Sequence, residues 1–251
     1  MRLPSLRLLA VAVLVGVFFL LLVLRAPAHL LGYALDEDRV RLSGISGTIW
    51  SGRASAAAIA LDDGWLQLGQ VQWSLSELYM LVLTPTADLV STWGQQRLKA
   101  NVQVTPAGRI RLRGVDATFS AALIKRFMPV NLRGRINITS RELVLEGGKP
   151  SAGEGRAVWQ QAFWRGSRGA QPLGDYLLEF RIPGPGRGEA RVTTLSGDVR
   201  VEGDVSLTGR RYSLDARIRS RGTMDEELAN ALALMAVPVD DGFMLKFSSE
   251  I

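Results

Sequence analysis

Apolar and polar residues alternate along most of the chain after Arg39. A period of two is typical of strands that have one buried face and one wet face. In the longest series, Val199–Leu207, valine, glycine and leucine alternate with charged or hydroxyl residues. The residues at 209–211 form a turn signal, and a second alternating series follows over Tyr212–Ile218. This pair predicts an antiparallel hairpin with one solvated face.

The same alternation predicts further strands along the chain. They cover residues 40–42, 54–61, 65–73, 80–83, 98–104, 110–112, 132–139 and 243–247. Half-polar strands favour an antiparallel sheet over the uniformly apolar strands of a doubly wound α/β domain. The predicted fold class is therefore mostly β: a curved, mainly antiparallel sheet, either an open half-pipe or barrel-like, preceded by a transmembrane helix and accompanied by two short helices.

Two segments have helical spacing instead. The first lies between Thr118 and Pro129, and the second begins at the capping box 223–226 and ends before Pro238. Their apolar positions are Phe119, Leu123 and Phe127 in the first segment, and Leu228, Ala231, Leu232 and Met235 in the second. We expect both helices to close an open end of the sheet.

Near the N-terminus, Leu8–Leu24 is a run of seventeen residues without a charge, and Arg7 and Arg25 flank it. As a helix it is about 26 Å long, close to the ~30 Å of a bilayer core. The run predicts a single membrane anchor, with Leu8, Val15, Phe18 and Leu24 among the residues in contact with lipid. The alternative is a signal peptide cleaved after Ala28, because Ala26-Pro27-Ala28 resembles a small-x-small cleavage site.

Positive charge before the apolar run places the N-terminus in the cytoplasm. The predicted organisation is a cytoplasmic N-terminus at 1–7, a transmembrane helix at 8–24, a linker at 25–38 and an exported β-rich domain at 39–251. The predicted location is the cell inner membrane, crossed once, with the C-terminal domain in the periplasm.

The composition argues against catalysis. The chain has no cysteine, and its one histidine, His29, lies beside the predicted anchor, so neither a catalytic triad nor a His/Cys metal site is available to the exported domain. Paired carboxylates could act alone. However, the candidates lie in turns or at a helix start, where acids are favoured for structural reasons: Asp62, Asp63, Asp225, Glu226, Glu227, Asp240 and Asp241. We expect no enzyme activity, no cofactor and no metal.

Charge narrows the choice of partners. Without Arg2, Arg7 and Arg25, the remaining chain holds 27 basic and 24 acidic residues, a net charge of +3 that gives no reason to expect nucleic acid as a partner. Arginines nevertheless recur in stripes on the polar side of predicted strands: Arg109, Arg111 and Arg113; Arg133 and Arg135; and Arg217, Arg219 and Arg221. If adjacent, they would form a cationic face for acidic proteins or lipid headgroups. The alternative is an ordinary solvated face with interspersed acids.

Glycine and tryptophan four residues apart recur in Gly69–Trp73 and Gly155–Trp159. This spacing indicates either a two-lobed internal repeat or a local device in which glycine permits a bulge that tryptophan covers.

Several of these segments occur in an order that resembles type II secretion system protein N, also called general secretion pathway protein N. They are the N-terminal anchor, the stretch at 46–54 (SGTIWSGRA), Trp73-Ser74-Leu75, Leu132-Arg133-Gly134-Arg135, Gly155-x-x-x-Trp159 and the closing Pro238-x-x-Asp241-Gly242. The resemblance implies a non-catalytic, single-pass inner-membrane component of the machinery that exports folded proteins across the outer membrane. It also implies contact with the outer-membrane secretin and with inner-membrane assembly-platform proteins.

A second function is compatible with the same pattern. Curved β half-pipes that transfer lipid also need long alternating strands, with the apolar face lining a groove for acyl chains. The state of the apolar face distinguishes the two functions: an open groove favours lipid, and a filled core favours a docking scaffold.

Overall fold

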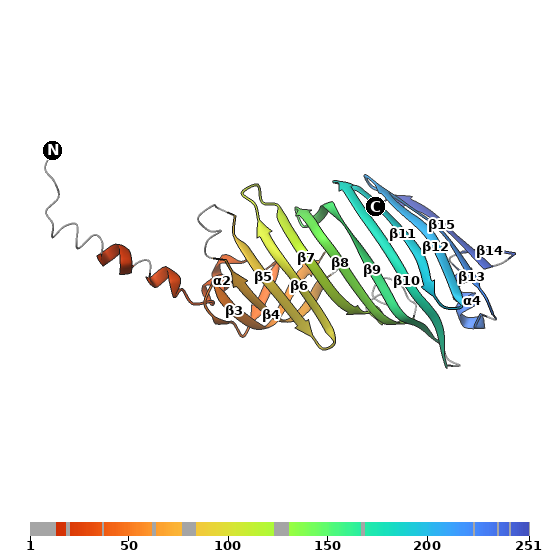
Figure 1. Cartoon of the computed structure of the whole chain (residues 1–251), viewed down its shortest axis with the longest axis horizontal. Helices are drawn as coiled ribbons and strands as arrows, with labels where there is room; N and C mark the ends of the chain where they lie inside the picture. Colours follow the sequence, from red (N-terminus) through yellow and green to blue (C-terminus); the bar gives the residue numbers. More distant parts are fainter. Residues whose placement is uncertain are drawn as a thin grey trace. The chain divides into compact units, whose positions relative to one another are not determined.

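The computed structural model describes residues 14–18, 21–36, 38–61, 64–76, 84–122, 131–166, 169–222, 224–234, 236–240 and 242–250. Within these residues the protein is mostly β, and every strand pairing is antiparallel, as the alternation predicts (Figure 1). The chain divides into two compact units, Met1–Trp93 and Gly94–Ile251.

The first unit is a small antiparallel sheet. Its strands are β1 (Val40–Ser43), β2 (Ser46–Gly47), β3 (Ser51–Leu61), β4 (Gly64–Leu75) and β5 (Thr86–Trp93), in the order β1-β3-β4-β5, with β2 also paired to β3. A five-residue helix, α2 (Leu30–Ala34), precedes them. One face carries a cluster of buried residues: Ala28, Ala54, Ala57, Val71 and Trp73. The small residues of β3 let Trp73 lie close to the sheet.

The second unit contains the longer strands. They are β6 (Gln96–Val104), β7 (Ile110–Ser120), β8 (Leu132–Glu146), β9 (Lys149–Gly166), β10 (Gly169–Gly184), β11 (Arg187–Ser196), β12 (Val199–Thr208), β13 (Arg211–Ser220), β14 (Val237–Val239) and β15 (Gly242–Glu250). They pair in sequence order except at the end, where β15 lies between β13 and β14. The predicted hairpin is confirmed: Val199 to Thr208 pairs residue by residue with Ser220 to Arg211.

Residues directly opposite each other in an antiparallel pair point to the same side of the sheet. The registers therefore define two faces of the second unit. We call the side that carries Arg156 and Glu179 the polar face, and the side that carries Ala157 and Leu178 the apolar face.

One end of the apolar face has a packed core. Its buried residues are Ala162, Trp164, Leu173, Tyr176, Val199, Ile218 and Leu228. Leu228 comes from the helix α4 (Glu226–Ala233), which contacts β9. Asp225 caps this helix by accepting hydrogen bonds from the backbone amides of Glu227 and Leu228 at 3.0 and 3.3 Å. The second predicted helix is thus confirmed. Asp225 is its cap, while Thr223 lies outside the described residues.

The first predicted helix is wrong at its start. Phe119 belongs to β7, which continues to Ser120, and the part of that segment from 123 to 130 lies outside the described residues. A spacing of four residues fits a period of two as well as a helical turn, and the apolar positions Val115 and Ala117 continue into Phe119 along one face of the strand. The strand predicted at 80–83 also lies outside the described residues.

In the predicted anchor, residues 14–18 and 21–24 are helical, and Leu8 is outside the described part. Val15, Phe18 and Leu24 are exposed. No helix in the described part of the chain has both the length and the apolar character needed to cross a membrane.

Candidate interaction surfaces

The end of the apolar run and the residues after it are hydrogen-bonded to the sheet of the first unit. The indole N–H of Trp50 donates to the carbonyl of Val23 at 2.8 Å, although 27 residues separate them. The amide of Ile49 donates to the carbonyl of Ala26 at 2.9 Å, and the amide of Ala28 donates to the carbonyl of Gly47 at 3.0 Å. The corner between β2 and β3 therefore holds residues 23–28, which begin with the last two residues of the apolar run, through three hydrogen bonds. We call residues 23–28 the exit segment.

The exit segment also contributes to the core of the first unit. Ala28 is only 1% exposed and belongs to the buried cluster around Trp73, and Leu31 of α2 packs against the same cluster. The range predicted as a linker, 25–38, thus contains a buried core residue, a short helix and the isolated bridge between Pro27 and Thr48.

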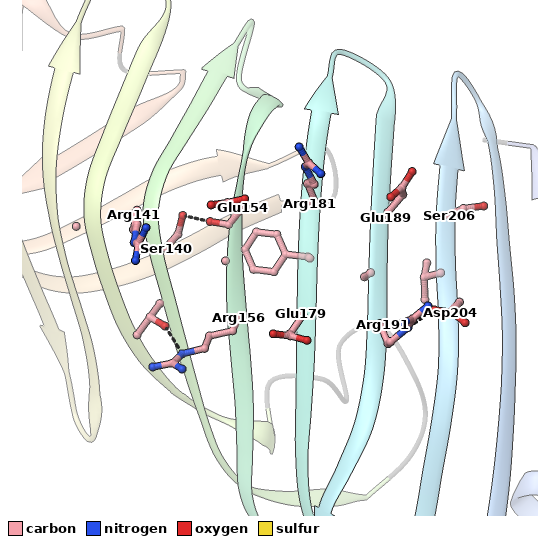
Figure 2. Close-up of a pocket in the computed structure, with 16 residues that line it drawn as sticks. Ser140, Arg141, Glu154, Arg156, Glu179, Arg181, Glu189, Arg191, Asp204 and Ser206 are labelled. Carbon is pink, nitrogen blue, oxygen red and sulfur yellow. Dashed lines mark hydrogen bonds and ion pairs between the residues drawn. The ribbon is translucent and has the colours of Figure 1, made fainter.

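A row of mainly charged residues crosses nine strands on the polar face of the second unit. Each member lies directly opposite the next: Lys99, Asp116, Thr139, Arg156, Glu179, Arg191, Asp204, Asp215 and Lys246. Basic and acidic residues alternate through most of the row. Figure 2 shows its central part, with Arg156 and Glu179 on neighbouring strands and Arg191 directed at Asp204. These pairings make the face charged without giving it one dominant sign.

A second row beside the first completes a shallow trough of about 1090 Å³. It consists of Glu154, Arg181, Glu189 and Ser206, again directly opposite one another. Nearest neighbours in the two rows mostly have opposite charges, both across and along the strands. The Nε of Arg191 lies 2.8 Å from Asp204, and this hydrogen bond raises the pKa of the Arg191 guanidinium above its usual value. The trough is therefore suited to hydrated polar contacts and offers no deep cavity for a substrate.

Seven of the eight arginines in the predicted stripes are the candidate contacts with partners, and they lie in three separate places. Arg109 and Arg111 pair with Glu146 and Glu142 at 3.2 and 2.8 Å, and Arg113 lies opposite Glu142. Arg133 and Arg135 lie at the other end of β8, opposite Phe163 and Gln160. Arg217 and Arg219 lie on β13, opposite Glu202 and Arg200. Their role as contacts stays a prediction, and the structure gathers them into groups rather than into one continuous patch.

Among the described residues, no group of three or more His, Cys, Asp or Glu side chains is placed to hold a metal ion. Of the candidate acids, Asp225 serves as the helix cap, while Asp62, Asp63 and Asp241 lie outside the described residues. We find no arrangement in the described surfaces that points to a reaction.

The apolar face carries an equally long row. It runs through nine strands without a charged or hydrogen-bonding side chain: Leu98, Ala117, Ile138, Ala157, Leu178, Val192, Gly203, Ala216 and Leu245. Eight strand spacings correspond to about 38 Å. The sequence predicts the individual strands of this row, but the registers are needed to align them.

A known protein family matches most of the chain. The sequence model of one protein family, described as "Type II secretion system (T2SS), protein N", matches residues 38–245. No curated protein and no solved structure matches the chain. The match covers both units and nearly all of the strands described above. The chain therefore belongs to the type II secretion system protein N family.

Proposed function

We propose that this chain is a non-catalytic scaffold of the type II secretion machinery, anchored in the inner membrane through 8–24, with its β units in the periplasm. Membership of the protein N family supports a role in secretion. The exit segment is the observation that carries the anchored scaffold. Its hydrogen bonds and the buried Ala28 join the apolar run directly to a folded sheet. A membrane helix connected in this way would hold the first unit at the membrane surface.

The balance of charges supports binding of other proteins as the role of the β units. A row of alternating charges on the polar face selects a partner whose surface carries the complementary charges in the same order. Each exposed ion pair within the row contributes little to the stability of the fold by itself. The proposed partners are the outer-membrane secretin and the inner-membrane assembly-platform proteins. The grouped arginines at Arg109–Arg113, Arg133–Arg135 and Arg217–Arg219 are the proposed contacts with acidic surfaces or headgroups.

Gene deletion with defined complementation tests this function. We expect deletion to leave folded exoproteins in the periplasm, while export across the inner membrane continues. The full chain should restore secretion, and so should a chain in which an unrelated transmembrane helix replaces 8–22. A chain exported by a cleavable signal peptide and beginning at Val23, which keeps the exit segment but is not anchored, should not. Normal secretion in the deletion strain would contradict the secretion role, and full rescue by the released chain would contradict the anchored scaffold.

The apolar row favours a second candidate function, the binding of lipid. Nine strands of uncharged side chains suit an alkyl chain, which has no hydrogen-bonding groups to leave unsatisfied on an apolar surface. The packed core around Trp164 and Leu228 fills one end of the same face and favours the scaffold there. Mass spectrometry of lipids extracted from the purified chain decides between them: a stoichiometric phospholipid supports lipid handling, and its absence after extraction from native membrane supports the scaffold.

A further inference from the structure

The last long strand of the second unit has an edge that is only partly paired. On one side β15 pairs with β13 from Gly242 to Glu250. On the other side β14 pairs only with Gly242, Phe243 and Met244. No other described strand lies beside residues 245–249, so their outward backbone groups form an open edge. Five residues is about the length of an average strand.

Exposed apolar side chains are concentrated in the C-terminal part of the second unit. In the described part of the second unit, five large apolar residues are strongly exposed: Val104, Leu195, Leu234, Val237 and Phe247. Three of them, Leu234, Val237 and Phe247, lie between the end of α4 and β15. Phe247 is 50% exposed, and its ring contacts that of Tyr212 at a centroid distance of 5.5 Å. Proteins usually protect long edges with charges, bulges or covering segments. Here only the first three residues of β15 are covered, and an apolar ring lies beside the open part.

The charge of this edge indicates what it can bind. Residues 245–249 contain one charged residue, the exposed Lys246, and its neighbour on β13 is Asp215. Two copies that paired through this stretch would bring their lysines together, whereas an acidic side chain beside Lys246 is attracted. The registers place Phe247 beside Leu214 on the apolar face and Lys246 beside Asp215 on the polar face. An added strand would therefore need apolar and acidic side chains in alternation.

We propose that residues 245–249 of β15 are a docking edge, to which an extended acidic segment of another subunit adds as a strand. Its main chain completes the ladder, its apolar side chains cover Phe247, and its acidic side chains lie next to Lys246. This inference rests on the proposed scaffold function and names the surface and the class of partner. Arg217 and Arg219, two of the predicted contact residues, lie on β13 opposite Met244 and Gly242, in the part of the sheet where β14 covers β15.

Peptide binding to the full chain in detergent tests the edge. The probe is a fluorescein-labelled peptide of alternating valine and glutamate, and its control is the same peptide methylated on alternate backbone nitrogens, which keeps the side chains but loses the ladder. We expect saturable binding by the first peptide, slowed amide exchange confined to 245–249, and no binding by the methylated peptide. Equal binding of both peptides would overturn strand addition.

Two substitutions test the side-chain requirements. Lys246→Glu should weaken binding of the valine–glutamate peptide roughly tenfold and improve binding of a valine–lysine peptide, since the charge at the contact is reversed. Phe247→Lys should weaken both peptides. The matched control is Lys149→Glu, which makes the same charge change at the first residue of β9 and should bind as the unaltered chain does. Amide exchange over β12 and β13 confirms that each variant is folded.

Two outcomes would overturn the inference in distinct ways. If 245–249 is already protected in the free chain and the protection disappears on dilution, a second copy occupies the edge. If the valine–glutamate peptide does not bind while gene deletion still blocks secretion, the docking edge is wrong and the scaffold function stands. Normal secretion after deletion would instead remove the scaffold function, whatever the peptide does.

Discussion

The two units share one kind of contact, in which a tryptophan packs against a glycine of the neighbouring strand, but different segments pack on their cores. We call each of these segments the cover of its unit. In the first unit, the indole of Trp73 donates to the carbonyl of Ile49 at 3.1 Å, and its ring occupies the space beside Gly52 on the neighbouring strand. In the second unit, the indole of Trp159 donates to the carbonyl of Arg133 at 3.1 Å and lies against Gly134. A β-carbon at either glycine would come within 2.5 Å of the tryptophan, so only glycine permits the contact.

The covers differ in their origin. The cluster of the first unit includes Ala28 of the exit segment and packs against Leu31 of α2, whereas the cluster of the second unit includes Leu228 of α4. The first unit therefore depends on residues that directly follow the apolar run, and the second unit depends on residues near its own C-terminus. Among the described residues, this difference joins the end of the predicted anchor to the core of the first unit.

Removal of the cover of the second unit should have the largest effect. Leu228 is 6% exposed, and Leu228→Ala should lower the free energy of unfolding of the second unit by about 2–5 kcal/mol through lost burial and a residual cavity. Hydrogen exchange followed strand by strand measures this, and β3 and β4 should keep their protection. The control is Leu195→Ala, which removes an exposed side chain and should change little. Equal loss of protection in β3 and β4 would contradict separate covers.

Overpacking the cover of the first unit is the reciprocal test. Ala28→Leu adds three carbon atoms at a site that is 1% exposed, and it should destabilise the first unit by about 1–3 kcal/mol. The same exchange at the exposed Ala56 of β3 is the matched control. Loss of amide protection in β3 and β4, with β9 and β10 unchanged, is the expected result. A folded first unit of unchanged stability would show that the exit segment does not belong to its core.

The shared tryptophan contact predicts similar costs in the two units. Trp73→Phe and Trp159→Phe each remove an indole hydrogen bond of the same length, and each should cost about 0.5–1.5 kcal/mol from that bond, with an added packing loss. Denaturant unfolding of the full chain, read alongside hydrogen exchange, measures both. Trp93→Phe, at a residue 45% exposed, is the control. A large cost at one site and none at the other would break the equivalence.

The smallest predicted effect is a pH dependence of the free energy of unfolding, and it is confined to the second unit. Burial first, and the neighbouring Asp175 second, raise the pKa of Tyr176 to about 12, and its hydroxyl donates to the carbonyl of Val199 at 2.9 Å. Because the folded pKa lies above the unfolded value of 10, this contribution to stability is complete below pH 10 and is lost as pH rises toward 12. Tyr176→Phe should remove this part of the alkaline loss. If the stability of the Tyr176→Phe variant fell between pH 10 and 12 as much as that of the unaltered chain, this prediction would be wrong.

The alternation of residues was sufficient to predict a mostly antiparallel β fold and the hairpin of β12 and β13, because those two strands pair without a bulge. The alternation did not predict β9 and β10, the two longest strands described. Register shifts near Gly174 in the β9–β10 pair, and near Arg133 and Arg141 where β8 meets β9, move side chains from one face to the other. A bulge interrupts the period of two, so the strand continues where its pattern stops.

The interaction surfaces were less accessible from the sequence. The arginine stripes were visible, but their separation into three groups depends on strand order and on acids in neighbouring strands, such as Glu142. The recurring spacing of four residues between glycine and tryptophan was also visible. However, each tryptophan covers a glycine of the adjacent strand, and the site beside Gly155 is occupied by Phe180 instead. The contact between Val23 and Trp50 joins positions 27 residues apart, and no local pattern marks it.

The intact mass of the chain extracted from native membranes tests the central claim most directly. If the exit segment remains attached to the apolar run and forms the cover of the first unit, the mass corresponds to a chain that retains residues 8–28. A mature chain that begins at His29 would contradict the account, because the first unit would then lack Ala28 and the hydrogen bonds of Val23 and Ala26.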